Sequence, residues 1–161
     1  MNCKSLFSLM QKEDVLKLAK EAVKEFPLPL EKPQFTFLTK RKFAFYLSES
    51  PLEMHLEYTP AFVAHLPEGE LVCFCMDILK NFLQGDKEEK KKVIKAITIH
   101  ELFHIYNKKR AKDGKEALRS EAAVHQEIKK YFKEYYALLE KHEDENKLNI
   151  TRRVQPEFTV I

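Results

Sequence analysis

The sequence has 161 residues, of which 44% are apolar, and this is enough for one domain with a hydrophobic core. The 28 Lys and Arg and the 25 Asp and Glu are mixed along the chain, so the net charge of +3 does not favour a nucleic-acid-binding surface. No apolar run approaches the ~20 residues of a membrane-spanning helix, and the three cysteines include no C-x-x-C pair, so we expect a protein of the cytoplasm.

The first half of the chain predicts a helix followed by a sheet. Residues 12–26 predict an amphipathic helix, because apolar residues recur at spacings of three and four until Pro27. Residues 34–76 predict four or five short strands. The segments with the alternation typical of strands are 34–38, 43–47, 53–58, 61–66 and 70–76, and the last two flank a tight turn.

The second half predicts helices. A helix over residues 77–84 is closed by Gly85, and Asp86 then has the position of an N-cap, with Glu89 three residues on as in a capping box. The helix that follows extends to about residue 109, and a last long helix covers about 118–142. Residues 1–145 therefore predict a single domain, and residues 146–161 an extended C-terminal tail.

Two histidines of the predicted helix 86–109 form a candidate metal site. His100 and His104 lie four residues apart, which turns both imidazoles to one side of the helix. Such a pair can bind one Zn²⁺, and the metal lowers the pKa of its bound water to ~7. Glu101 stands beside this metal, where its carboxylate can accept a proton from the water. The alternative is a helix in which the histidines are merely packed.

A catalytic zinc also needs a third protein ligand and an open position for water. Glu121 follows on the next predicted helix, and His125 lies one turn further on the same face. Either residue can be the third ligand. The other can then hydrogen-bond a ligand histidine and fix its tautomer.

An H-E-x-x-H motif followed by a glutamate on the next helix resembles the pattern of the gluzincin metallopeptidases. The order of the predicted elements, over roughly residues 12–142, is similar to that of the soluble minigluzincins, compact relatives of the catalytic domains of membrane-bound CAAX-prenyl and heat-shock endopeptidases. The chain departs from the family at His125, where an acidic residue is often found.

This resemblance implies that His100, His104 and Glu121 hold zinc and that Glu101 is general base and then general acid. It implies that the strand 71–76 pairs with an extended substrate. It also implies an oxyanion-stabilising Tyr or His, for which the sequence offers four downstream candidates, Tyr131, Tyr135, Tyr136 and His142.

The expected fold class is therefore α+β, with a small, mostly antiparallel sheet packed on the H-E-x-x-H helix and a following glutamate helix. The expected function is that of a zinc-dependent endopeptidase acting on peptides or unfolded proteins. The alternatives are a zinc-binding regulatory or peptide-binding domain without turnover, and an interaction module without metal.

The C-terminal tail is also expected to have a function. C-terminal segments maintain latency in the minigluzincins, and the tail 146–161 is rich in apolar and β-branched residues. We therefore expect it to return to the cleft and keep the protein a latent zymogen. A last strand packed elsewhere on the sheet is the alternative.

Overall fold

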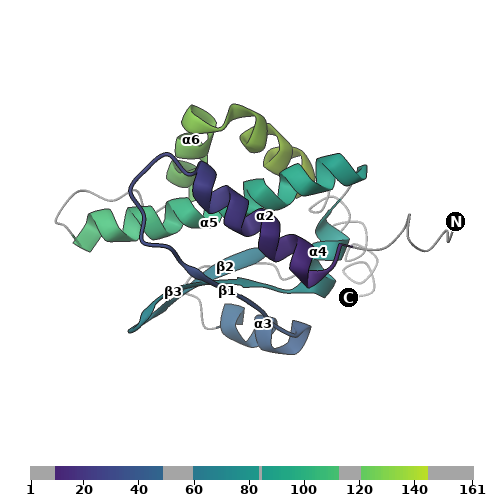
Figure 1. The fold of residues 1–161 in the computed structure, drawn as a ribbon, viewed down its shortest axis with the longest axis horizontal. Helices are drawn as coiled ribbons and strands as arrows, with labels where there is room; N and C mark the ends of the chain where they lie inside the picture. The colour runs from purple at the N-terminus through teal and green to yellow at the C-terminus, as the bar shows by residue number, and fades with distance from the viewer. Residues whose placement is uncertain (1–9, 49–59, 84, 113–120, 145–161) are drawn as a thin grey trace, which may run out of the picture.

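The computed structural model describes residues 10–48, 60–83, 85–112 and 121–144, which form helices around a small sheet (Figure 1). The strands are β1 (Gln34–Phe37), β2 (Ala61–Leu66) and β3 (Gly69–Phe74). The helices are α2 (Lys12–Glu25), α3 (Lys40–Ser48), α4 (Met76–Phe82), α5 (Lys87–Lys112) and α6 (Glu121–Tyr131), followed by a helical segment at residues 133–144. The α+β class is therefore confirmed. The predicted strand 53–58 and the tail 146–161 lie outside the described residues.

None of the helices in these ranges is long and apolar enough to cross a membrane.

The sheet of the described residues is mixed, with the strand order β1-β3-β2. Val72 of β3 lies opposite Phe35 of the parallel strand β1 and opposite Val63 of the antiparallel strand β2. The prediction of a mostly antiparallel sheet of four or five strands is wrong for this part of the chain, because helix α3 follows β1 and prevents a hairpin there. Both edges of β3 are occupied over residues 71–74, so the expected substrate pairing along 71–76 is wrong as well.

Residues 43–47 belong to helix α3 and not to a strand. Thr39 begins this helix, because its carbonyl accepts a hydrogen bond from the N–H of Phe43 at 2.9 Å. The side chain of Phe43 is fully buried against Cys75, whereas Phe45 is 60% exposed. In a strand the two rings would lie on the same face, and the helix separates them so that only Phe43 enters the core.

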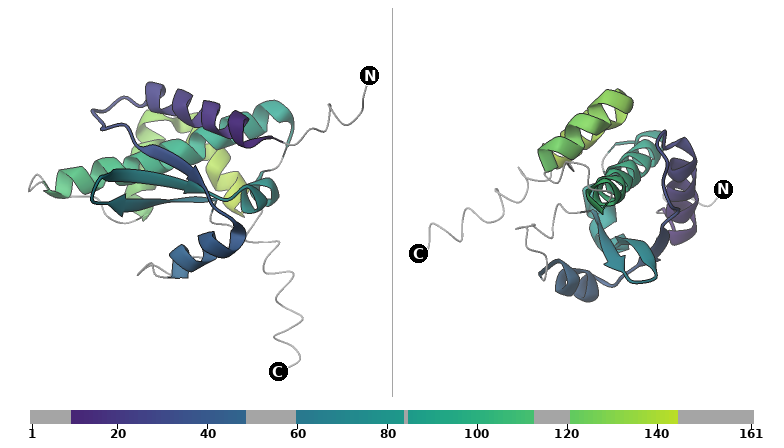
Figure 2. Two further views of the ribbon diagram at one scale, coloured as in Figure 1. Left: turned by 60° about the horizontal axis from the view of Figure 1, so that its bottom comes forward. Right: turned by 90° about the vertical axis from the view of Figure 1, so that its left-hand side faces the viewer.

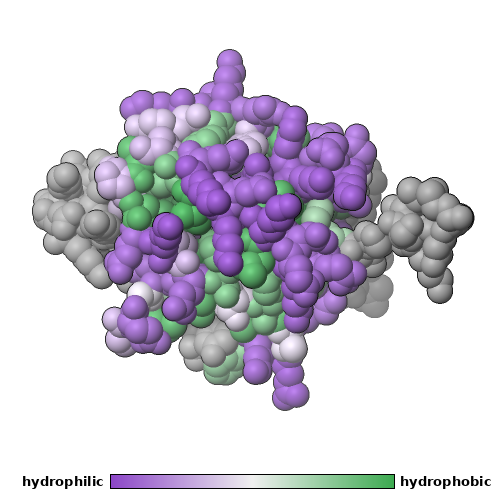
Figure 3. Space-filling view, viewed as in Figure 1, coloured by the Kyte–Doolittle hydropathy of each residue, from purple (hydrophilic) through white to green (hydrophobic). Residues whose placement is uncertain are grey.

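Helix α5 is the central element of the molecule. It lies between the sheet and α6, with α2 beside it, while α3 lies across the sheet (Figures 1 and 2). Asp86 caps α5 as predicted, since its Oδ1 accepts a hydrogen bond from the N–H of Glu89 at 2.8 Å. Hydrophilic side chains cover much of the face shown in Figure 3 and leave smaller apolar areas between them.

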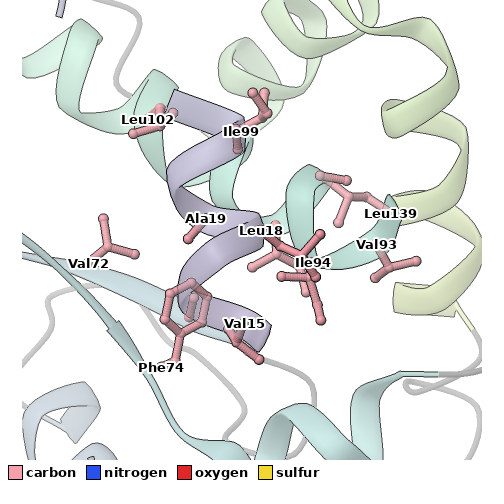
Figure 4. Close-up of a cluster of buried hydrophobic side chains, with 14 of the residues drawn as sticks. Val15, Leu18, Ala19, Val72, Phe74, Val93, Ile94, Ile99, Leu102 and Leu139 are labelled. Carbon is pink, nitrogen blue, oxygen red and sulfur yellow. The ribbon is translucent and has the colours of Figure 1, made fainter. Parts of the chain in front are cut away.

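The core holds α5 firmly in place. The prediction of an amphipathic first helix is confirmed, because the buried side chains of α2 pack against α5 and β3 (Figure 4). The main contributors are Val15, Leu18, Ala19, Val72, Phe74, Ile94, Ile97, Ile99 and Leu102. Each fully buried aliphatic or aromatic side chain of this kind stabilises the fold by about 1.5–3 kcal/mol. The buried face of α5 fixes the direction of the side chains on its other face.

The predicted single helix over 118–142 is wrong in one respect, because the chain turns at Phe132. Helix α6 crosses α5, and the ring of Phe132 lies 6.5 Å from that of Phe103. The segment 133–144 then returns along the first half of α5, where Lys92 pairs with Glu134 at 2.8 Å. No proline or glycine marks this turn in the sequence. Packing of both halves on α5 outweighs the propensity to continue the helix.

Candidate metal centre

His100, Glu101 and His104 form a compact group of potential ligands on α5. One ligand atom from each can be chosen so that all lie within 4.8 Å of one another. The two imidazole rings have their centres 4.7 Å apart and are nearly perpendicular, at 83°. Two imidazole nitrogens and a carboxylate oxygen are donors that Zn²⁺ accepts. The predicted convergence of the three side chains is thus confirmed in the fold.

Glu101 is held by the neighbouring histidine. Its side chain is only 7% exposed, and its Oε1 lies 3.2 Å from Nδ1 of His100. When the imidazole proton is on Nδ1, it is donated to the carboxylate and the lone pair of Nε2 is open to a metal. In this tautomer Glu101 orients the ring of His100.

The charge of Glu101 also reaches β3. Burial, and secondly the charge of Glu101, raise the pKa of the Cys73 thiol to about 12. The thiol is therefore protonated at neutral pH. Cys73 and Cys75 are 2% and 1% exposed, and buried free cysteines of this kind behave as small hydrophobic residues.

Helix α6 brings a third histidine to this group. The ring of His125 has its centre 5.4 Å from that of His100, and the ring of Tyr136 lies 6.1 Å beyond it. His125 therefore lies beside His100 of α5. Glu121 is the first residue of α6, one turn before His125. Its side chain lies outside the described part of the structure, so the third ligand stays a prediction.

The fold separates the four candidates for oxyanion stabilisation. Tyr136 is the one whose ring lies next to His125. Tyr135 donates a hydrogen bond to Oε2 of Glu25 at 3.3 Å, on the α2 side of the molecule. His142 is fully buried, with its Nδ1 2.9 Å from a carbonyl oxygen one turn earlier in its helix. Tyr131 is 40% exposed.

One polar residue of α5 was missed by the sequence analysis. Asn107 is 3% exposed, and neither the oxygen nor the nitrogen of its carboxamide has a hydrogen-bond partner. It follows His104 by three residues and continues the stripe of His100 and His104 along the helix. A polar side chain at that spacing is the signal that could have revealed it.

No protein-family model matches this chain, and comparison with curated proteins and with solved structures gave no match either. The similarity to minigluzincins therefore depends on the motif and on the order of elements, and the function has to be argued from the site.

Proposed function

We propose that this protein is a zinc-dependent endopeptidase of the gluzincin type. The observation that carries the proposal is the convergence of His100, Glu101 and His104 within 4.8 Å on one helix. This face of α5 adjoins a core of apolar side chains. In the proposed enzyme the active-site helix α5 packs on the sheet, and helix α6 supplies the third ligand.

Glu101 is the proton carrier of the proposed reaction. Zinc, when bound by His100 and His104, supplies a Lewis acid and lowers the pKa of its water to ~7. The carboxylate of Glu101 takes the proton of the attacking water and passes it to the amine that leaves.

The third ligand is proposed to be Glu121, with His125 as a residue that orients a ligand histidine. The ring of His125 is close to that of His100, at 5.4 Å. However, among the described residues, the group whose ligand atoms all lie within 4.8 Å contains His100, Glu101 and His104 and does not include His125. The assignment of Glu121 follows the resemblance to the gluzincin pattern, and His125, which then does not bind the metal, can hydrogen-bond a ligand histidine.

Tyr136 is proposed to stabilise the oxyanion. A hydrogen bond with Glu140, and then burial, raise the pKa of Tyr136 above its usual value. The hydroxyl donates to Glu140 in this structure, and in the proposed reaction it exchanges that acceptor for the oxyanion. The ring of Tyr136 lies 6.1 Å from that of His125, and this supports its assignment to the same site.

An extended substrate is proposed to pair with β2. Within the described ranges, β2 has β3 on one side and no strand on the other. An exposed strand edge of this kind can bind a peptide through main-chain hydrogen bonds. Helix α5, which carries the proposed metal ligands, contacts β2, and this supports the proposal.

The test is metal analysis combined with a peptide-cleavage assay. Gently purified protein should contain about one zinc ion per chain, and His100→Ala and His104→Ala should lose it. Cleavage of an unfolded protein substrate should stop with a chelator and return with zinc. Glu88→Gln, which changes an exposed carboxylate on the same helix, should keep both properties. Protein that takes up no zinc would refute the proposal, and zinc without cleavage would favour a regulatory or peptide-binding domain.

A further inference from the structure

Asn107 differs from the other buried polar side chains of the described residues, which are Thr98, Glu101 and His142. The hydroxyl of Thr98 donates to a carbonyl one turn earlier at 2.9 Å, and Nδ1 of His142 lies 2.9 Å from such a carbonyl. The carboxylate of Glu101 lies 3.2 Å from an imidazole nitrogen. The carboxamide of Asn107 has no partner for its oxygen or its nitrogen.

This arrangement is unfavourable for the folded protein by itself. A buried donor or acceptor without a hydrogen bond loses its hydration and gains nothing in return. A leucine has the same branched arrangement of heavy atoms and would occupy the position of Asn107 without burying an unsatisfied polar group. The asparagine is therefore better explained by a partner that it meets when the site is loaded than by the packing of α5.

The position of Asn107 identifies this partner. Residues three apart on a helix are neighbours, with Cβ atoms about 5–6 Å apart, and Asn107 follows His104 by three. Helical side chains lean toward the N-terminus of their helix and cover the preceding turn. The short side chain of Asn107 therefore lies over the turn that carries His104.

We propose that Asn107 is a positioning residue of the metal centre. The imidazole of His104 binds the metal through one ring nitrogen, and the other ring nitrogen donates its N–H to Oδ1 of Asn107. This inference rests on the proposed zinc site. Metal-binding histidines almost always donate their other N–H to an oxygen, which fixes the tautomer and the ring orientation. Glu101 offers such an oxygen to His100, and Asn107 offers one to His104. The carboxamide does so without adding a second charge.

Two substitutions test this role. Asn107→Leu removes the acceptor and keeps the number and branching of the side-chain heavy atoms, and Asn107→Asp keeps an acceptor in the same place. Zinc affinity, measured by competition with a chromophoric chelator, should fall about 10–100-fold in Asn107→Leu and should be largely retained in Asn107→Asp. Urea unfolding in excess chelator should show Asn107→Leu to be at least as stable as the wild type. Thr98→Val, a buried polar change on the same helix away from the histidine stripe, should leave zinc affinity unchanged.

The possible outcomes separate this inference from the function on which it rests. Wild-type protein without zinc affinity would overturn both. Wild-type affinity in Asn107→Leu would overturn the positioning role alone, and the proposed zinc site would stand. A parallel loss of affinity and of metal-free stability in Asn107→Leu, without rescue by Asn107→Asp, would assign Asn107 to the packing of α5 instead.

Discussion

Glu101 is proposed to have two separable tasks, as a general base and as a hydrogen-bond acceptor for His100. A general base needs the charge of the carboxylate, which Glu101→Gln and Glu101→Ala both remove. Both substitutions should therefore reduce the rate of cleavage by ~10²–10⁴-fold. As a hydrogen-bond acceptor for Nδ1 of His100 at 3.2 Å, the carboxylate is mimicked by the oxygen of glutamine but not by alanine. We therefore expect Glu101→Gln to keep the zinc affinity of the wild type and Glu101→Ala to lose part of it. Equal zinc loss in both variants, measured by chelator competition, would make Glu101 a ligand.

The third ligand is decided by the ranking of two alanine substitutions. Glu121→Ala should weaken zinc binding more than His125→Ala, because the first removes a bond to the metal and the second only a hydrogen bond to a ligand histidine, worth about 10–100-fold in affinity. Glu127→Ala, a second carboxylate of α6, serves as the control. A greater loss in His125→Ala would exchange the two assignments.

Tyr136 should contribute to catalysis and not to metal binding. Tyr136→Phe keeps the ring next to His125 and removes the hydroxyl alone. Loss of one oxyanion donor reduces kcat by about 10²–10³, and KM and zinc content should change little. Tyr135→Phe is the matched control, because that hydroxyl donates to Glu25. Similar kcat values in both variants would remove Tyr136 from the mechanism.

At the scale of elements, the sequence predicted what depends on local spacing. The apolar periodicity of α2, the cap at Asp86 and the shared face of His100 and His104 are each contained in fewer than twenty consecutive residues, and each is found in the structure. Residues 43–47 were predicted wrongly because Phe43, Phe45 and Leu47 alternate as in a strand. Phe43 packs against Cys75, over thirty residues away, and this tertiary contact favours the helix.

The parts of the site that depend on tertiary contacts could not be predicted. The turn at Phe132 has no proline or glycine, and it results from packing on α5. This turn brings Tyr136 to His125 and carries His142 to Phe82, where the rings stack at 6.0 Å. The sequence could therefore propose four aromatic candidates for one role but had no basis for choosing among them.

The tail 146–161 was predicted to keep the enzyme latent, and this stays a prediction. Its apolar and β-branched residues suit pairing with a strand edge as a substrate would, and β2 offers such an edge among the described strands. Truncation before Asn146 should then raise cleavage of an unfolded protein substrate and leave zinc content unchanged. A folded, zinc-loaded truncation that is no more active than the full chain would contradict autoinhibition.

At the scale of the whole molecule, one lysine links the helices that surround the core. Nζ of Lys95 on α5 lies 3.2 Å from Glu21 and 3.3 Å from Glu25 on α2. The hydroxyl of Tyr135, in the segment 133–144, donates to Glu25 at 3.3 Å. Burial lowers the pKa of Lys95, but the hydrogen bond to Glu21 and the charge of Glu25 outweigh burial, so the pKa is raised overall. Burial, followed by the charge of Glu25, raises the pKa of Tyr135.

These shifts predict that alkaline pH destabilises the fold. Three side chains bind their protons more tightly in the folded protein than in the unfolded chain, those of Cys73, Lys95 and Tyr135. The stabilisation is therefore complete below the unfolded pKa values and is lost as the pH rises through the folded ones. For Cys73 the window begins near the ordinary thiol pKa of 9.0 and extends to about 12. Within it, this thiol alone can lower the free energy of unfolding by up to ~1.4 kcal/mol per pH unit.

Urea unfolding in excess chelator at several pH values between 7 and 10.5 measures this effect. The free energy of unfolding should be nearly level up to about pH 8.5, where the unfolded Cys73 thiol begins to ionise, and should then fall. Cys73→Ala loses some stability at every pH because it leaves a small cavity, but it should show a shallower fall above pH 9. Cys75→Ala, which removes a neighbouring buried thiol, controls for the loss of stability that the cavity causes. A wild-type stability that rises with pH, or an unchanged slope in Cys73→Ala, would show that the buried thiol is not the group that titrates.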